Sequence, residues 1–254
     1  MKGYTIVNEL DTIVTRYFSK DTIAITYSEI DEEEFNKMIQ NMGYYERPDI
    51  LSIYDDKIVG IEHFEFDSYK NTRKGSNYKI QENFIEQKFN KMINSKTNKK
   101  NEIVNHDQII NTSNLKQYYD NFKKILISHI NNIDEYIEHI VSNYGSEKTI
   151  EIWFFVEDVT PLGKYYLKKG NCSPGLLLPF SKEIIDILRN NKGIKGIIFG
   201  VYAMNEYKIV ICYNDEKTLN KIEKDDYFKV DDSEFLSLNP QTTSFVLLIP
   251  KNKK

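Results

Sequence analysis

Two acidic residues, Asp49 and Glu62, lie thirteen positions apart in a segment whose pattern predicts a β-hairpin. Asp49 precedes the apolar run 50–54, and Glu62 lies within a second run, 58–66. The short polar segment 55–57 between them is typical of a tight turn, which brings the outer ends of two strands together. Because carboxylate oxygens are the hard ligands that Mg²⁺ prefers, this spacing predicts an oxygen-rich metal site.

Alternation along the second run separates Glu62 from its acidic neighbours, because successive side chains of a strand point to opposite faces. One face carries Ile58, Gly60, Glu62, Phe64 and Phe66, and the other carries Val59, Ile61, His63, Glu65 and Asp67. A buried carboxylate without partners is costly, so we expect Glu62 to have a cation or hydrogen-bond donors beside it. His63, on the opposite face, is a candidate to assist a water molecule.

Each of these residues also has a structural interpretation. Asp49 follows a proline and can be a turn residue that hydrogen-bonds its own backbone. Glu62 can form a structural ion pair with Arg47 or with a lysine. His63 can mark an exposed strand end.

The pair Pro48-Asp49 followed by Glu62 resembles the PD-(D/E)XK nuclease superfamily. There, a Pro-Asp opens one strand and an acidic-x-Lys triplet lies on the next. The resemblance covers roughly residues 31–67, and a strand at 150–156 and a helix at 181–188 agree in kind. It implies a restriction-endonuclease-like core in which the two carboxylates hold Mg²⁺ or Mn²⁺ for phosphodiester hydrolysis.

The sequence departs from the superfamily where the triplet requires lysine, because Phe64 stands two residues after Glu62. Lys70, Arg73 and Lys74 follow closely, and Lys74 together with His63 is our candidate auxiliary catalytic pair. A solvated turn is the alternative interpretation of this basic segment. The missing lysine also leaves two other functions open: an inactive nuclease-fold binding protein, or an immunity-type interaction protein.

Composition limits the partners. The 254 residues carry a net charge of −4, so no overall positive field predicts nucleic-acid binding. Local contacts remain possible for Lys70, Arg73, Lys74 and the loop 164–170, which interleaves lysines with tyrosines. No apolar run approaches the ~20 residues of a membrane span. Two distant cysteines fit a reducing cytoplasm, and nothing in the sequence indicates an oligomeric state.

The remaining periodicities predict an α/β protein. We expect a helix from 32 to about 42 capped by Ser28 or Asp31, one long helix over 114–144, a central strand at 150–156, a helix at 181–188, and strands at 12–14, 22–27, 196–203, 208–213 and 244–249. Helices between strands favour a mixed central sheet flanked by helices. We therefore predict a single α/β domain over residues 1–254, with residues 80–145 as a helical elaboration.

Overall fold

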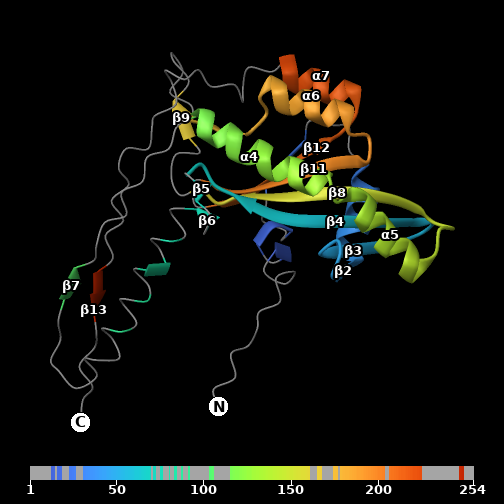
Figure 1. Ribbon diagram of the computed structural model, residues 1–254, viewed down its shortest axis with the longest axis horizontal. Helices are drawn as coiled ribbons and strands as arrows, with labels where there is room; N and C mark the ends of the chain where they lie inside the picture. Colours follow the sequence, from blue (N-terminus) through green and yellow to red (C-terminus); the bar gives the residue numbers. More distant parts are fainter. Residues whose placement is uncertain are drawn as a thin grey trace, which may run out of the picture.

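The protein is a mixed β-sheet with helices packed on both faces (Figure 1), which confirms the predicted fold class. The computed structural model describes residues 13–14, 16–18, 23–26, 31–69, 71–72, 75–76, 80, 83–84, 87, 91, 103–105, 115–160, 165–167, 174–176, 178–203, 206–224 and 246–248. Most of residues 81–114, part of the predicted helical elaboration, therefore lie outside the described residues.

The main sheet has seven strands. Their spatial order is β1 (Ile23–Thr26), β12 (Glu206–Tyr213), β11 (Ile194–Ala203), β8 (Thr149–Asp158), β4 (Lys57–Phe66), β3 (Ile50–Tyr54) and β2 (Met42–Tyr44). Strand β8 is central, as its unbroken apolar run predicts, and pairs in parallel with both β4 and β11. Strand β3 runs antiparallel to β4 and to the edge strand β2.

The predicted hairpin is confirmed, with a turn one residue shorter than expected. Lys57 is already part of β4, so Asp55 and Asp56 alone connect it to β3. Asp55 has a φ of 49°, a left-handed conformation that aspartate tolerates better than most side chains. The helix before the hairpin, α2 (Glu32–Gln40), ends earlier than predicted, because residues 42–44 pair with β3 as strand β2. Asp31 caps α2 by accepting hydrogen bonds from two backbone amides of its first turn.

The single helix predicted over 114–144 is wrong, because the segment forms two helices. They are α4 (Leu115–Ile130) and α5 (Ile133–Tyr144), separated by Asn131 and Asn132. Asparagine competes with the helix by hydrogen-bonding nearby backbone groups, which explains a break at two consecutive asparagines. The strand predicted at 12–14 is also wrong, because Ile13 and Val14 are helical.

Two further helices, α6 (Lys182–Asn190) and α7 (Glu216–Lys224), lie on the same face of the sheet as α4 (Figure 1). Ser181 caps α6, as predicted, whereas α7 was not foreseen. Three short strand pairs lie outside the main sheet: β5 (Asn71–Thr72) with β6 (Gly75–Ser76), β9 (Tyr165–Leu167) with β10 (Pro174–Leu176), and β7 (Ile103–Asn105) with β13 (Val246–Leu248). Among the described residues, no helix has the length and apolar character needed to cross a membrane.

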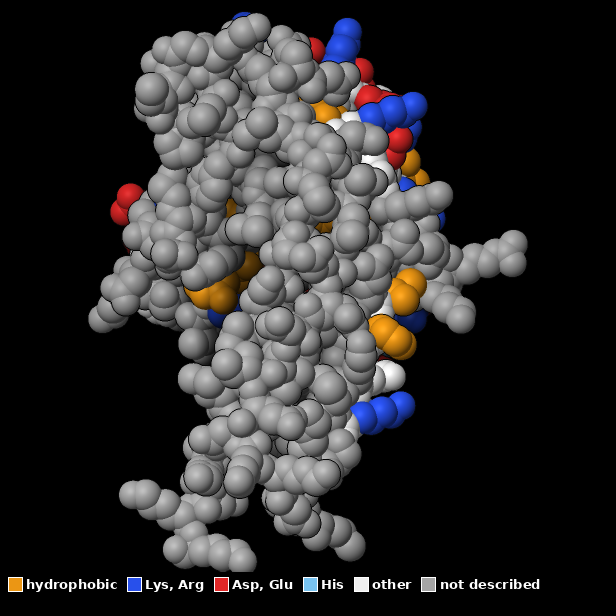
Figure 2. Space-filling view, turned by 90° about the vertical axis from the view of Figure 1, so that its left-hand side faces the viewer, with side chains coloured by type: hydrophobic (Ala, Val, Ile, Leu, Met, Phe, Trp, Pro, Cys, Tyr) orange, Lys and Arg blue, Asp and Glu red, His pale blue; other side chains and the backbone are white. Residues whose placement is uncertain are grey.

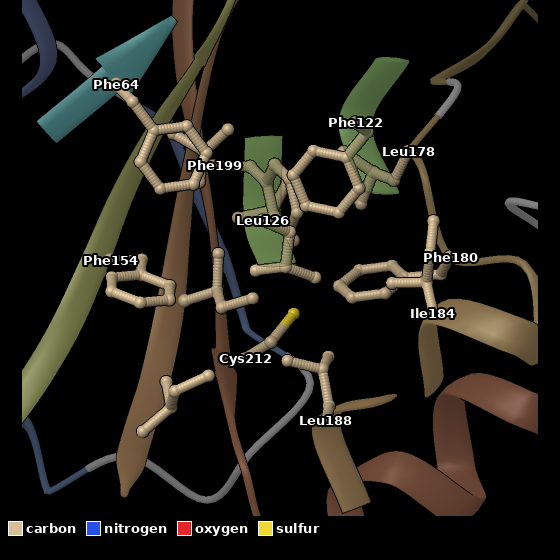
Figure 3. Packing of buried hydrophobic residues seen from close by; sticks show 14 of the residues in the cluster. Phe64, Phe122, Leu126, Phe154, Leu178, Phe180, Ile184, Leu188, Phe199 and Cys212 are labelled. Atoms are coloured by element: carbon tan, nitrogen blue, oxygen red, sulfur yellow. The ribbon is translucent and has the colours of Figure 1, made fainter. Parts of the chain in front are cut away.

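The sheet separates two apolar cores, as the alternation along β4 predicts. Ile58, Phe64 and Phe66 pack under α4 to α7, and Val59 and Ile61 pack on the other face with Met38 of α2. Figure 3 shows part of the first core, in which side chains of two helices pack against the strands. The helices contribute Phe122 and Leu126 from α4 and Ile184 and Leu188 from α6. The strands contribute Phe64, Phe154 and Phe199. Glu62 of β4 therefore lies on the face of the first core, whereas Glu65 is exposed.

Candidate functional site

Glu62 lies on the face of β4 that is covered by α4 and α5, and its carboxylate has two partners there. The Tyr136 hydroxyl donates a hydrogen bond to Oε1 of Glu62 at 2.9 Å. The same oxygen lies 3.1 Å from Nδ1 of His129. Because the Glu62 side chain is only 12 % exposed, the hydrogen bond from Tyr136 offsets part of the cost of burying its charge. The expectation that Glu62 has polar partners on its apolar face is confirmed.

Asp49 lies beside Glu62 at the start of β3. The antiparallel register pairs Ile50 with Ile61, so the next position along the hairpin places Asp49 against Glu62. Oδ2 of Asp49 accepts a hydrogen bond of 2.8 Å from the backbone N–H of His63. This bond crosses to β4, so Asp49 does more than bond the backbone of its own turn.

Both carboxylates act on the same tyrosine. Burial raises the pKa of Tyr136 well above its ordinary value, and the charge and hydrogen bond of Glu62 raise it further. The charge of Asp49 makes a smaller contribution in the same direction. Tyr136 therefore stays protonated and remains a hydrogen-bond donor.

His129 lies over Phe64, the residue that stands where the PD-(D/E)XK triplet would have a lysine. Its imidazole stacks face to face on the ring of Phe64, with centroids 4.3 Å apart and planes 6° from parallel. Phe64 is buried and also contacts Phe154 edge to face. The nitrogen-bearing side chain close to Glu62 therefore comes from helix α4 rather than from strand β4.

The structure places the ring of His63 on the opposite face of the sheet from Glu62. Its Nε2 lies 2.9 Å from Oε2 of Glu157, and both side chains are nearly inaccessible, at 5 and 6 % exposed. Burial alone would raise the pKa of Glu157, but hydrogen bonds from His63 and Tyr17 outweigh it and lower this pKa. Burial and Glu157 raise the pKa of Tyr17. His63 is thus connected to the candidate site through its backbone N–H and not through its ring.

Arg47, the other partner considered for Glu62, instead forms an ion pair with Glu135. Its carbonyl oxygen accepts a hydrogen bond of 2.8 Å from Nδ1 of His139, which anchors the chain just before Pro48 on helix α5. Lys70, Arg73 and Lys74 lie outside the described residues, as do the side chains of the loop 164–170.

The end of the β3–β4 hairpin carries two carboxylates, those of Asp49 and Glu62. Within the described part of the chain, no group of three histidine, cysteine or acidic residues could hold a metal ion. Mg²⁺ usually keeps several waters and takes only one or two carboxylates from the protein. Among the described residues, Tyr136 donates the one hydrogen bond of the Glu62 carboxylate, and Oε1 accepts it.

The chain matches no family model, no curated protein and no solved structure.

Sequence reasoning missed His129 and Tyr136 as members of the site. Both fall on the buried stripe of the helical pattern, His129 three residues after Leu126 and Tyr136 three residues after Ile133. A polar residue on an otherwise apolar stripe was the available signal, since such a group needs a buried polar partner.

Proposed function

We propose that this protein hydrolyses phosphodiester bonds of nucleic acid with Mg²⁺ or Mn²⁺ held by Asp49 and Glu62. The observation that carries the proposal is the pair of carboxylates at one end of the β3–β4 hairpin, both acting on Tyr136. The order of helix α2, hairpin, helices and parallel strand β8 also agrees with the resemblance to PD-(D/E)XK nucleases.

A bound divalent ion supplies charge neutralisation at the phosphoryl group and lowers the pKa of a bound water. The residues of the chain fix the geometry for that chemistry. The backbone N–H of His63 holds Asp49, while Tyr136 and His129 hold Oε1 of Glu62. Partners that orient a ligand carboxylate in this way preserve metal affinity and activity.

Nucleic acid would require local basic contacts, because the overall charge is negative. At the upper right of Figure 2, the described basic and acidic side chains lie next to one another. The candidates for phosphate contacts remain Lys70, Arg73, Lys74 and the loop 164–170.

A second candidate function is binding without catalysis, either as an inactive nuclease-fold binding protein or as an immunity-type interaction protein. One observation favours it: Phe64 fills the position of the lysine and is buried in an aromatic contact. The side chain of Phe64 is uncharged, so position 64 cannot supply the cation that the lysine would provide.

Cleavage of plasmid DNA and of single-stranded DNA and RNA with Mn²⁺ or Mg²⁺ tests the proposal. We expect Asp49→Asn and Glu62→Gln to abolish cleavage, because each removes a charged ligand. The matched control is Glu65→Gln, the same change on an exposed residue of β4 that faces away from Glu62. Wild-type protein should also gain about 2.7 kcal/mol of unfolding free energy at a Mn²⁺ concentration 100 times Kd.

Two results would decide against the proposal. If Mn²⁺ stabilises the wild type and not Glu62→Gln, but no nucleic acid is cleaved, the binding function is the better interpretation. If Mn²⁺ stabilises neither, Glu62 is not a metal ligand and the nuclease interpretation fails.

A further inference from the structure

We infer that the free edge of strand β2 binds an extended, basic segment of a partner protein by β-strand addition. Strand β2 is the last strand in the order of the main sheet and pairs on one side only, with β3. Figure 1 shows it beyond β3, at the margin of the sheet. An unpaired strand edge presents a row of backbone donors and acceptors that a further strand can join. The inference is independent of the proposed function, since it needs neither a metal nor cleavage.

The register of β2 determines which of its backbone groups face outward. The N–H of Tyr45 donates to the carbonyl of Asp49 at 2.9 Å, and Gly43 lies two positions earlier in the same ladder. Bonded and non-bonded positions alternate in an antiparallel pair, so Gly43 and Tyr45 direct their backbone groups toward β3. Met42 and Tyr44 occupy the alternate positions and direct theirs away from it. No hydrogen bond of the described residues reaches these outward groups, which are therefore available to an incoming strand.

The side chains of β2 leave this edge unprotected. Natural proteins usually blunt an exposed edge with charged side chains or proline, whereas residues 42–44 are methionine, glycine and tyrosine. Tyr44 is 65 % exposed, and Tyr144, at the end of α5, is 48 % exposed. The ring of Tyr144 lies 6.0 Å from that of Tyr45, which two hydrogen bonds hold against α5. Exposed tyrosines are typical anchors of protein interfaces, and their faces attract lysine and arginine side chains.

The surroundings of β2 are strongly acidic. Residues 31–57 and 133–148, which form α2, β2, β3, the hairpin turn and α5, contain twelve acidic and four basic residues. Their net charge is −8, against −4 for the whole chain. Each of the four bases already contacts an acid or a carbonyl oxygen: Lys37, Arg47, Lys57 and Lys148. Glu46 and Glu138 are exposed and have no ion-pair partner among the described residues, so they can meet basic side chains of a partner.

The charge of this surface indicates which partner fits. A second copy of this chain would bring two surfaces of the same sign together, and nucleic acid would bring its phosphates against the acids. A basic strand avoids both penalties, because its backbone extends the sheet while its lysine or arginine side chains reach Glu46, Glu138 and the tyrosine rings. Alternate side chains of a strand share one face, so the expected partner is an extended segment in which basic and uncharged residues alternate.

The first test uses the protein alone. Amide hydrogen exchange followed by ¹⁵N NMR should be fast for Met42 and Tyr44 and slow for Gly43 and Tyr45, because only the second pair donates into the sheet. If Met42 and Tyr44 were as strongly protected as Gly43, the edge would already be covered and the inference would be overturned.

The second test uses a fluorescent heptapeptide in which lysine and valine alternate, and a counterpart with glutamate in place of lysine. In fluorescence anisotropy with the full chain, we expect the basic peptide to bind about tenfold or more tightly than the acidic one. Its binding should protect the amides of Met42 and Tyr44. Its affinity should fall about tenfold between about 0.15 M and 1 M salt, because the screening length falls from ~8 Å to ~3 Å.

Variants separate the contributions of the backbone and of the charge. Tyr44→Pro removes an outward N–H without removing a donor to β3 and should weaken the basic peptide more than about tenfold, whereas Tyr44→Ala keeps that N–H and should lose only the contribution of the ring. Glu46→Lys should weaken the peptide about three- to tenfold. The matched control is Asp120→Lys, a charge reversal on an exposed residue of α4, which should leave the affinity within about twofold of wild type.

Three further results would overturn the inference. Equal affinity for the basic and acidic peptides, or no binding of the basic peptide at about 1 mM, would show that the edge does not accept a basic strand. A dimer in sedimentation velocity that Tyr44→Pro dissociates would assign the edge to a second copy of the chain. Protection of the Met42 and Tyr44 amides by a thymidine oligonucleotide, and not by the peptide, would assign it to nucleic acid.

Discussion

Replacing Gly60 by alanine tests how closely Pro48 packs on strand β4 beside the candidate site. A Cβ atom at position 60 would lie 2.8 Å from Cγ of Pro48 and 3.0 Å from Cδ1 of both Ile140 and Ile152. Carbon atoms without a bond between them do not approach this closely, so the neighbours must move. Because Pro48 directly precedes Asp49, a shift of the proline also moves the carboxylate that holds the proposed metal.

The loss of stability in Gly60→Ala depends on which of the neighbouring atoms can move away from the new methyl group. The two isoleucine contacts involve the ends of flexible side chains, whereas Pro48 is a rigid ring, so it decides the outcome. An extra methyl group in a packed core typically costs 1 to 3 kcal/mol, and we place this site at about 2 to 3 kcal/mol. Alanine loses about 0.5 to 1 kcal/mol less backbone entropy than glycine on folding. The net loss of unfolding free energy is therefore about 1 to 2.5 kcal/mol, or about 2 to 10 °C in Tm.

Urea denaturation followed by circular dichroism measures this change, and Gly43→Ala on β2 is the matched control. At Gly43 the nearest atom to the added Cβ is the carbonyl oxygen of Leu51 at 3.9 Å, so alanine fits and the free energy of unfolding should rise by up to about 1 kcal/mol rather than fall. Gly60→Ala with wild-type stability would refute the close packing of Pro48 on β4. Equal losses in both variants would show that any methyl group on this hairpin is harmful, which the distances do not predict.

Three further changes test other parts of the site. Tyr136→Phe removes the donor to Oε1 of Glu62 and should lower the free energy of unfolding by about 1 to 3 kcal/mol in urea, because the buried carboxylate loses a hydrogen bond; an unchanged value would mean that this bond is not made in solution. Ser52→Ala removes a buried hydrogen bond of 2.7 Å to the carbonyl of Met38 and should cost about 1 kcal/mol, whereas Ser142→Ala on the exposed side of α5 should cost less than half of that. Because the folded protein lowers the pKa of Glu157 below 4.5, its contribution to stability is present above that pH and is lost as the pH falls through the lower folded-state pKa. The stability difference between wild type and Glu157→Gln should therefore narrow on acidification below about pH 4.5, and a difference that grows would contradict the sign of the shift.

The hairpin and its faces could be predicted from the sequence because both depend on neighbouring residues. The two-residue turn at Asp55 and Asp56 joins two apolar runs, and strict alternation sorts each side chain to one face. Glu62 therefore stands out as the only acid on its face before any contact is known. Strand β8 was predicted for a similar reason, since a continuous apolar run fits a strand buried on both faces.

The rest of the site depends on contacts between residues distant in the sequence, which no local pattern specifies. His129 and Tyr136, which reach Glu62 from α4 and α5, follow the last residue of the hairpin by more than 60 positions. Their positions depend on the break at Asn131 and Asn132 and on how α4 and α5 pack over Ile58 and Phe64 of β4. The short strand β2 was missed because three residues at a sheet edge leave hardly any alternation to detect.

The two faces of β4 carry similar carboxylate–histidine contacts, and the helices packed on each face determine how exposed the contact is. Glu62 and His63 are adjacent, and each bears a carboxylate–histidine contact, one with His129 and one with Glu157. On the Glu157 side both partners are almost fully enclosed, so that contact stabilises the strand and, through the His63 N–H, positions Asp49. On the Glu62 side the histidine remains partly exposed beside a second carboxylate. The same type of contact is therefore enclosed on one face and partly exposed on the other, where α4 and α5 cover the strand.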